Sequence, residues 1–344
     1  MKRIFLSLCL GCISHIYVNG TALPTPIDSL TFFEYLQKES IAEISLETDF
    51  SKLQKDLNSA EYQPTLLSYT KADGTKQSIE AGLKPRGKTR KKVCKYPPLK
   101  LKLPKESLKD LGLNSEQKYK LVCQCKKGTL YNQLILKEFL AYKLYNIITP
   151  YSFQVHLVKI NFINTKNGKI NQQFAFIIEP IASLAKRNKS QAIVITEDAN
   201  NNLDAQMTIN MSMFQYLIGN ADWGIQFMHN VKLLQSANNK ALLPVPYDFD
   251  FSGLVNAPYA KPNPIFPANC VQDRHFFARG CNEVALRKSI QLFVDHETEI
   301  INTVANMPHL DKACIRAINN YFKAFFELIK DEKAIKKAFH SSSK

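Results

Sequence analysis

Two tight-turn signals divide the first half of this chain into short extended segments. Asp73-Gly74 and Asn167-Gly168 each lie between two such runs, and these dipeptides favour the tight turns of β-hairpins. Hairpins are therefore predicted over residues 62–84 and 153–180. The chain is accordingly expected to begin with a strand-rich region.

The spacing of apolar residues changes from a strand period to a helix period along the chain. Alternation predicts strands, and three- or four-residue spacing predicts helices. The further predicted elements are strands at 97–103, 119–125, 231–234 and 242–251, and helices within 23–40 and at 130–148, 205–218, 283–305 and 311–339. A basic loop at 84–95 and a Pro-rich excursion at 258–270 separate some of them. This order predicts an α+β fold with a cleft between two lobes.

The N-terminus has the pattern of a signal peptide. Lys2-Arg3 precedes an apolar run at 4–13, and small residues follow at Gly20 and Ala22. The run is too short to span a bilayer, and no later stretch approaches that length. We expect export to the periplasm or the exterior, with a lipid anchor on Cys12 as the less favoured alternative.

The 344 residues are enough for one large domain or two small ones. The expected division is a signal peptide over 1–20, a strand-rich N-terminal lobe over 21–204 and a helical C-terminal lobe over 205–344. The C-terminal lobe carries the predicted catalytic loop.

Six cysteines follow the signal segment, and an even number in an exported chain favours disulfides. They are Cys94, Cys123, Cys125, Cys270, Cys281 and Cys314. The favoured pair is Cys270 with Cys281, which closes a short loop, and the second is Cys94 with Cys123 or Cys125. A zinc site is the alternative, although the spacing is not that of standard zinc ligands.

The formal charge of +15 indicates an anionic partner. Basic residues concentrate between Lys84 and Lys127. Nucleotides, acidic proteins, polyanions and membrane surfaces all fit this charge. No nucleic-acid-binding motif is present, so specific DNA or RNA binding is not expected.

Two neighbouring segments, GNADWGIQFMHN and PYDFDFSG, contain the polar residues best suited to chemistry. In chain order these residues are Asp222, His229, Asn230, Asp248 and Asp250. Phosphoryl transfer uses an acid that positions the acceptor hydroxyl, and an Asn and an Asp that hold magnesium. Purely structural interpretations also stay open: a helix-end cap, an ordinary turn and a solvated or calcium-binding strand end.

A second candidate segment is the basic stretch at 84–103. Arg86-Gly87-Lys88 allows close approach of a phosphate to the backbone, although the P-loop pattern is absent. Lys100 or Lys102 on the following strand is expected to pair with Glu138, an acid on an apolar helix face. The structural alternatives are a solvated basic loop and a surface glutamate.

These stretches together resemble the CotH-type spore-coat kinases and related atypical secretory-pathway kinase-like proteins. The resemblance runs from about Lys84 to Gly253. Its pieces are the R-G-x-[ST]-R-like run from Arg86 to Arg90, the helix with Glu138, the N-x-D loop running to H-N (Asn220, Asp222, His229, Asn230) and P-x-D-x-D (Pro246, Asp248, Asp250). The chain looks closer still to an uncharacterised group of exported bacterial proteins that share VCxxPPL, KEFLAYKLYN-like and PYDFDFSGLVNAPYA-like stretches.

The resemblance implies a two-lobed kinase-like fold, ATP as phosphate donor and Mg²⁺ or Mn²⁺ as cofactor. The acceptor is expected to be a protein or another anionic molecule with a hydroxyl. The site residues are Asp222 as the catalytic acid, Arg86, Lys100, Lys102 and Glu138 at the nucleotide, and Asn230, Asp248 and Asp250 at the metal.

Two features depart from the kinase pattern. There is no G-x-G-x-x-G loop, and the gap from Asp222 to Asn230 is longer than in ordinary kinases. The alternative function is therefore an inactive kinase-like scaffold that binds an anionic partner. A hydrolase of another class is disfavoured, because G-x-S-x-G and H-E-x-x-H are absent.

Overall fold

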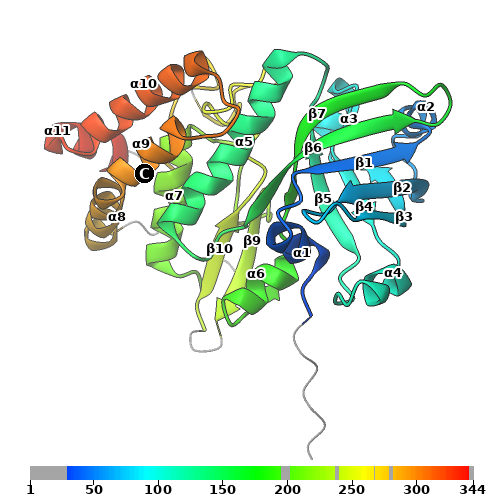
Figure 1. Cartoon of the computed structure of the whole chain (residues 1–344). Coiled ribbons are helices and arrows are strands. Elements are labelled where there is room, and N and C mark those ends of the chain that lie inside the picture. The colour runs from blue at the N-terminus through cyan, green and yellow to red at the C-terminus, as the bar shows by residue number, and fades with distance from the viewer. Residues whose placement is uncertain (1–28, 195–201, 237–239, 267, 279–281, 341–344) are drawn as a thin grey trace, which may run out of the picture.

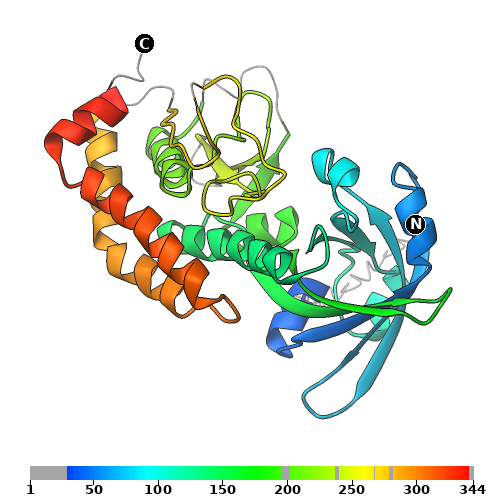
Figure 2. The same cartoon turned by 90° about the horizontal axis from the view of Figure 1, so that it is seen from above.

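The computed structural model describes residues 29–194, 202–236, 240–266, 268–278 and 282–340. A strand-rich part and a helix-rich part lie side by side, with α5 (Thr129–Ile148) between them (Figures 1 and 2). The predicted α+β class is confirmed. The predicted signal segment lies outside the described residues.

A closed barrel forms the strand-rich part. Its strands, in spatial order, are β1 (Glu43–Thr48), β2 (Gln63–Thr70), β3 (Lys76–Pro85), β4 (Leu99–Lys102), β5 (Lys118–Cys123), β7 (Ile170–Ile178) and β6 (Val155–Asn164). Both predicted hairpins are confirmed as β2–β3 and β6–β7. Neighbouring strands are antiparallel except β1 and β6, whose parallel pairing closes the barrel.

Alternation fills the barrel with apolar side chains and leaves charged ones outside. Leu99 and Leu101 of β4 are buried in the core, whereas Lys100 and Lys102 are only half-buried. This is the pattern that period-two alternation produces on a sheet with one covered face. The lysine-rich strands therefore present a cationic outer surface.

In the described part of the chain, four short helices accompany the barrel, one before β1 and three in connections between its strands. They are α1 (Phe32–Lys38), α2 (Phe50–Lys55), α3 (Thr89–Val93) and α4 (Lys105–Asp110). The predicted loop at 84–95 thus contains a helix, α3, whose Arg90 is buried although the segment is mostly basic. A charged residue can be buried only with compensating partners, and those partners are part of the site described below.

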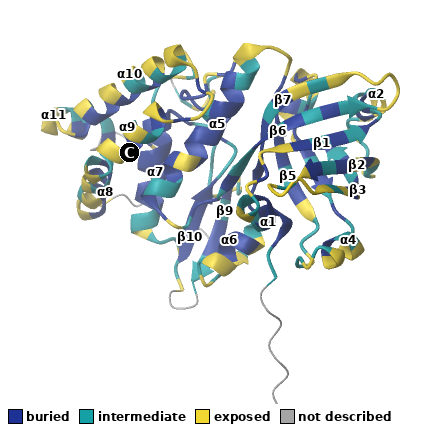
Figure 3. Ribbon diagram, viewed as in Figure 1, coloured by how far each residue is buried: buried dark blue, intermediate teal, exposed yellow. Residues whose placement is uncertain are grey.

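Most of helix α5 is buried and appears dark blue in Figure 3, while its first two residues and Lys143 are exposed. Its apolar residues share one core with the outer face of β5–β7 and with helices of the second part. The prediction of a helix at 130–148 with Glu138 among apolar residues is confirmed. The exposed fraction of Glu138 is 1%.

The helix-rich part also contains a small sheet. Its elements are α6 (Ile181–Arg187), β8 (Ser190–Ile193), α7 (Ala205–Ile218), β9 (Val231–Ser236), β10 (Leu242–Pro246), α8 (Glu283–Asp295), α9 (Glu297–Ala305), α10 (Lys312–Leu328), α11 (Glu332–Ile335) and a π-helical turn at Lys336–His340. The sheet order is β10-β9-β8, so β8, which lies before residue 204, pairs with β9 of the second part.

Two predicted helices are broken in the structure, and one predicted strand is shorter than expected. The helix predicted at 283–305 breaks at His296, and the one predicted at 311–339 breaks after Leu328. The strand predicted at 242–251 ends at Pro246, because Asp248 has a left-handed backbone with φ 68° that no strand accommodates. The two acids therefore lie after the strand, in a loop.

One disulfide joins Cys94 to Cys125, which confirms one of the two second-ranked pairings. The favoured pairing is wrong: Cys270 is a free thiol, and its Sγ lies 3.4 Å from Oδ1 of Asp273 in a tight turn. Cys281 lies outside the described residues.

Within the described ranges there is no cluster of three or more His, Cys, Asp or Glu side chains that suits a metal ion. No helix in those ranges is long and apolar enough to cross a membrane.

Candidate active site

The site begins where α7 ends. Gly219 has a left-handed backbone with φ 62°, and its amide closes the helix onto Gln215 and Tyr216 carbonyls. This backbone conformation favours glycine, and a Cβ here, 2.1 Å from the Tyr321 hydroxyl, would displace that side chain. The next residue, Asn220, is buried, and its Oδ1 accepts the N–H of Asp222 at 3.0 Å. The helix end thereby fixes the position of Asp222.

The Asp222 carboxylate is held by two side chains of the same loop. Nε2 of His229 lies 2.8 Å from its Oδ1, and Nδ2 of Asn230 donates to its Oδ2 at 3.1 Å. Nδ2 of Asn230 also donates to the Asp222 carbonyl at 2.8 Å. Three residues that the sequence predicted as functional are thus brought together, on a carboxylate that is partly exposed.

Backbone contacts hold Asp248 close to this loop in space. The N–H of Tyr247 donates to the carbonyl of Asn230 at 2.9 Å, and the N–H of Asp248 donates to the Tyr142 hydroxyl of α5 at 2.9 Å. Asn230 and Asp248 both have left-handed backbones, with φ values of 52° and 68°. Such conformations are uncommon outside glycine and are frequent at functional sites, where surrounding structure holds them.

Asn230 and Asp248 offer oxygen atoms suited to a hard cation. In the part of the chain that the structure describes, no hydrogen bond or ion pair engages the Asp248 carboxylate or Oδ1 of Asn230. Magnesium prefers such carboxylate and amide oxygens, completed by water and substrate. These two residues therefore fit the predicted metal, with Asp222 beside them.

Lys120 of β5 faces this group from the barrel, and sequence reasoning missed it. Its Nζ lies 4.4 Å from the centre of the Tyr247 ring, while Lys232 of β9 lies 5.8 Å from the same centre. Burial lowers the pKa of Lys120 to about 8, with a smaller contribution from the charge of Arg86, while Asp248 opposes the shift. The sheet register contains the missing signal: Lys84, Lys100 and Lys120 are cross-strand neighbours on β3, β4 and β5.

The other predicted cations divide between two places. The positive charge of Arg86 acts to lower the pKa values of both Lys120 and Glu138, so Arg86 lies close enough to influence this site. Its side chain is half-buried. Burial lowers the pKa of Lys100, and its charged neighbours Lys84, Lys118 and Arg86 add to the effect. Lys102 instead lies 5.7 Å from the Tyr62 ring and lines a separate pocket. The structure therefore brings Arg86 and Lys100 toward the site, but not Lys102.

The predicted pairing of Glu138 with a strand lysine is wrong, because its partner is Arg90 of α3. Nη1 of Arg90 lies 3.4 Å from Oε2 of Glu138, and both side chains are almost fully buried. Arg90 also donates to the carbonyl of Cys123. The short helix α3 inserts the arginine where the extended lysines of β4 do not reach.

Asp250, a predicted metal ligand, belongs to the Arg90 group. It is 4% exposed, and its Oδ2 lies 3.9 Å from Nε of Arg90. Burial and the charge of Asp248 raise the pKa of Asp250 to about 7, and Arg90 opposes this shift. Burial, followed by the charge of Asp250, likewise raises the pKa of Glu138 well above its usual range. We call Arg90, Glu138 and Asp250 the buried charge cluster.

Comparison with known proteins gives little beyond this geometry. No protein-family model matches the chain, and no curated protein matches it. Among solved structures, the chain is similar to the Helicobacter pylori proinflammatory kinase CtkA, with 11% identity and a TM-score of 0.42. That match covers 74% of this chain and 95% of the other. We draw no conclusion from so distant a likeness, and the CotH-type resemblance stays a prediction.

Proposed function

We propose that this chain is a phosphotransferase that uses ATP and Mg²⁺ or Mn²⁺ to phosphorylate a hydroxyl of a protein or another acceptor. The observation that carries the proposal is the arrangement around Tyr247. Its ring lies against Lys120 and Lys232, and its backbone joins Asn230 to Asp248. Anion-binding and cation-binding groups thus meet at one residue, as phosphoryl transfer requires.

In this proposal Asp222 accepts the proton of the acceptor hydroxyl. The acceptor oxygen forms a bond to the γ-phosphorus while the bond from that phosphorus to the β–γ bridging oxygen breaks, which leaves ADP. His229 and Asn230 hold Asp222 in position for the proton. Asn230 and Asp248 are the residues that would hold the metal, which neutralises phosphate charge when bound.

The cations of the barrel bind the phosphates in the same proposal. Lys120 is the principal residue, because it is the most deeply desolvated lysine beside Asp248, and Arg86, Lys100 and Lys232 surround it. Burial removes water that would stabilise the charged ammonium of Lys120, and a nearby phosphate supplies an opposite charge, so phosphate binding stabilises the protonated form of Lys120. We further propose that the protein acts outside the cytoplasm, which the Cys94–Cys125 disulfide supports.

An inactive scaffold is the second candidate, and one observation favours it. Both carboxylate oxygens of Asp222 already have partners, His229 and Asn230. An acceptor hydroxyl has to share or replace one of them. In a scaffold, the same contacts would simply stabilise the loop.

Thermal unfolding with ATP, with and without Mg²⁺ or Mn²⁺, tests the proposal. A ligand at a hundredfold excess over its Kd stabilises the fold by about 2.7 kcal/mol. We expect a metal-dependent rise in Tm that Asp248→Ala and Lys120→Met abolish. Lys102→Met is the matched control, since it removes a lysine from the same sheet at a different pocket. Absence of any shift with either metal would remove nucleotide binding and favour the scaffold.

A further inference from the structure

Two pockets lie next to each other beside Asp222, and Asn263 lines both. The first has a volume of about 280 Å³ and the second about 460 Å³. Nδ2 of Asn263 donates to the Ala221 carbonyl at 2.8 Å, which fastens the Pro-rich segment to the loop that carries Asp222. Residues 261–266 of the Pro-rich segment, which the phosphoryl-transfer proposal does not use, therefore line the two pockets.

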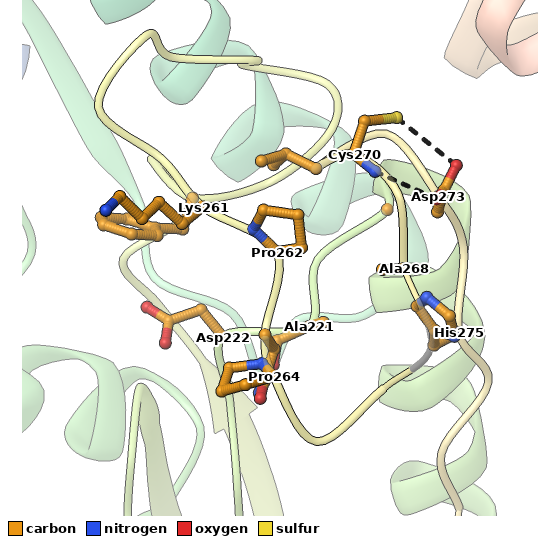
Figure 4. A pocket seen from close by; sticks show the side chains of 13 residues that line it. Ala221, Asp222, Lys261, Pro262, Pro264, Ala268, Cys270, Asp273 and His275 are labelled. Atoms are coloured by element: carbon orange, nitrogen blue, oxygen red, sulfur yellow. Dashed lines mark hydrogen bonds between the residues drawn. The ribbon is translucent and has the colours of Figure 1, made fainter.

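The first pocket is lined by Asp222 itself and by other charged and polar side chains set among apolar ones (Figure 4). Lys261 lines it with an exposed side chain, and within the described ranges no hydrogen bond or ion pair engages its ammonium group. Asp273, the other acid of this pocket, already accepts the backbone N–H groups of Asn269 and Cys270. Lys261 is thus a cation that an acidic partner would complement.

The second pocket is lined mainly by apolar and aromatic side chains. Trp223 and Phe277 form an edge contact with ring centres 5.8 Å apart, and Phe266 lies 6.4 Å from Phe277. Phe227 and Ile265 line the same pocket and are each 81% exposed. Large apolar side chains left this open beside a candidate active site indicate a binding surface.

A single residue, Asn220, fixes the apolar pocket relative to the catalytic group. Its Oδ1 accepts the N–H of Asp222, and its carbonyl accepts Nε1–H of Trp223 at 3.1 Å. The proposed proton acceptor and the pocket wall are therefore held by the same buried asparagine. A partner that fills the apolar pocket has its neighbouring residue beside Asp222.

We propose that these two pockets bind the acceptor, a protein segment whose hydroxyl residue lies between a large apolar side chain and an acidic one. The apolar side chain enters the pocket at Trp223, the hydroxyl reaches Asp222, and the carboxylate pairs with Lys261. This inference rests on the proposed phosphotransferase function, because it places the hydroxyl by reference to Asp222. The strongly basic character of the chain agrees with an acidic partner segment.

Fluorescence of Trp223, the only tryptophan in the chain, reports occupancy of the apolar pocket without nucleotide. The probes are three short synthetic peptides with one serine. The reference peptide has phenylalanine on one side and glutamate on the other; the others replace phenylalanine by alanine or glutamate by lysine. We expect the reference peptide to bind about tenfold more tightly than the alanine peptide, since a large apolar side chain is buried. Lys261→Glu should reverse the preference between the glutamate and lysine peptides.

Exposed substitutions test the surface without threatening the fold. Phe227→Ser and Ile265→Ser should abolish the preference for phenylalanine, whereas Ile170→Ser, 63% exposed on β7, should leave it unchanged. Equal affinity for the reference and alanine peptides, or an equal loss in the Ile170 control, would overturn the proposal. Transfer of phosphate from ATP to the bound peptide is measured separately. Peptide binding without transfer would support the docking surface and overturn the phosphotransferase function instead.

Discussion

The charge of Asp248 acts on two groups of charged residues, and these groups are built differently. In the buried charge cluster, Arg90 forms ion pairs with Glu138 and Asp250 and donates to a backbone carbonyl. Lys120, in the other group, has the ring of Tyr247 as its neighbour and no carboxylate within ion-pair distance in the described part of the chain. Arg90 is paired with carboxylates of the protein itself, whereas Lys120 remains available to an anion from outside.

This difference separates a structural role from a binding role. A buried ion pair that loses one partner leaves an uncompensated charge, so the cost appears in the stability of the fold. A desolvated lysine without a carboxylate partner already lowers stability, and its removal changes the affinity for a ligand. Substitutions in the two groups should therefore change different measurements.

The largest expected effect follows removal of Arg90. Arg90→Met leaves Glu138 and Asp250 buried without their cation, and should lower the free energy of unfolding by about 3–5 kcal/mol. Urea unfolding at neutral pH measures the change. Combining Arg90→Met with Glu138→Gln should recover part of the loss. A loss below about 1 kcal/mol, as for exposed pairs, would contradict the structural role of the cluster.

Like the buried charge cluster, the disulfide is expected to have a structural role. Cys94 directly follows α3 and is linked to Cys125 across a sequence separation of 31 residues. By loop-closure entropy, the double substitution Cys94→Ser with Cys125→Ser should cost roughly 3–4 kcal/mol of stability. At a temperature where the variant stays folded, its affinity for Mg·ATP should match wild type. A large loss of affinity in the folded variant would connect the disulfide to Lys120 and weaken the comparison.

Lys120→Met should give the opposite result. The affinity for Mg·ATP should fall about tenfold to a hundredfold, as loss of one charge-assisted phosphate contact predicts. The urea midpoint should stay the same or rise, because a desolvated cation has been removed. Calorimetric titration with ATP and parallel urea unfolding measure both quantities, with Lys102→Met as control. Destabilisation without loss of affinity would make Lys120 a structural residue.

A smaller effect is expected from pH alone. Because the pKa of Lys120 is about 8, the affinity for Mg·ATP should fall by about threefold to tenfold between pH 7.5 and pH 9. Lys120→Arg should flatten this dependence, since arginine stays protonated. The lysine pKa is lower in the folded than in the unfolded state, so its contribution to stability should rise with pH above about 8. If the affinity of wild type and of Lys120→Arg depended equally on pH, the titrating group would be a residue other than Lys120.

Local patterns predicted much of this molecule. The Asp-Gly and Asn-Gly turns located both hairpins, Gly219 located the end of α7, and the polar loop brought Asp222 to Asn230 as expected. Each of these depends on residues close in sequence. A turn, a helix end and a short loop are decided by backbone conformation over a few positions.

Non-local contacts were not accessible from the sequence. Whether Glu138 meets Lys100, Lys102 or Arg90 depends on a short helix that the basic composition of 84–95 concealed. Lys120 becomes notable only once β3, β4 and β5 are in register, because no local pattern distinguishes it from the surrounding lysines. The free Cys270 shows the same limit, since loop length alone did not decide its pairing.

Helix α5 has a consequence for motion. Its side chains belong to one continuous core that includes Val122 and Phe176 of the barrel and Phe214 and Phe322 of the helix-rich part. Rotation of the two parts as rigid bodies would have to slide packed side chains past one another along the whole helix. In the proposed phosphotransferase, nucleotide entry is therefore expected to involve displacement of surface loops, with the relative orientation of barrel and helices nearly the same in the free and bound protein.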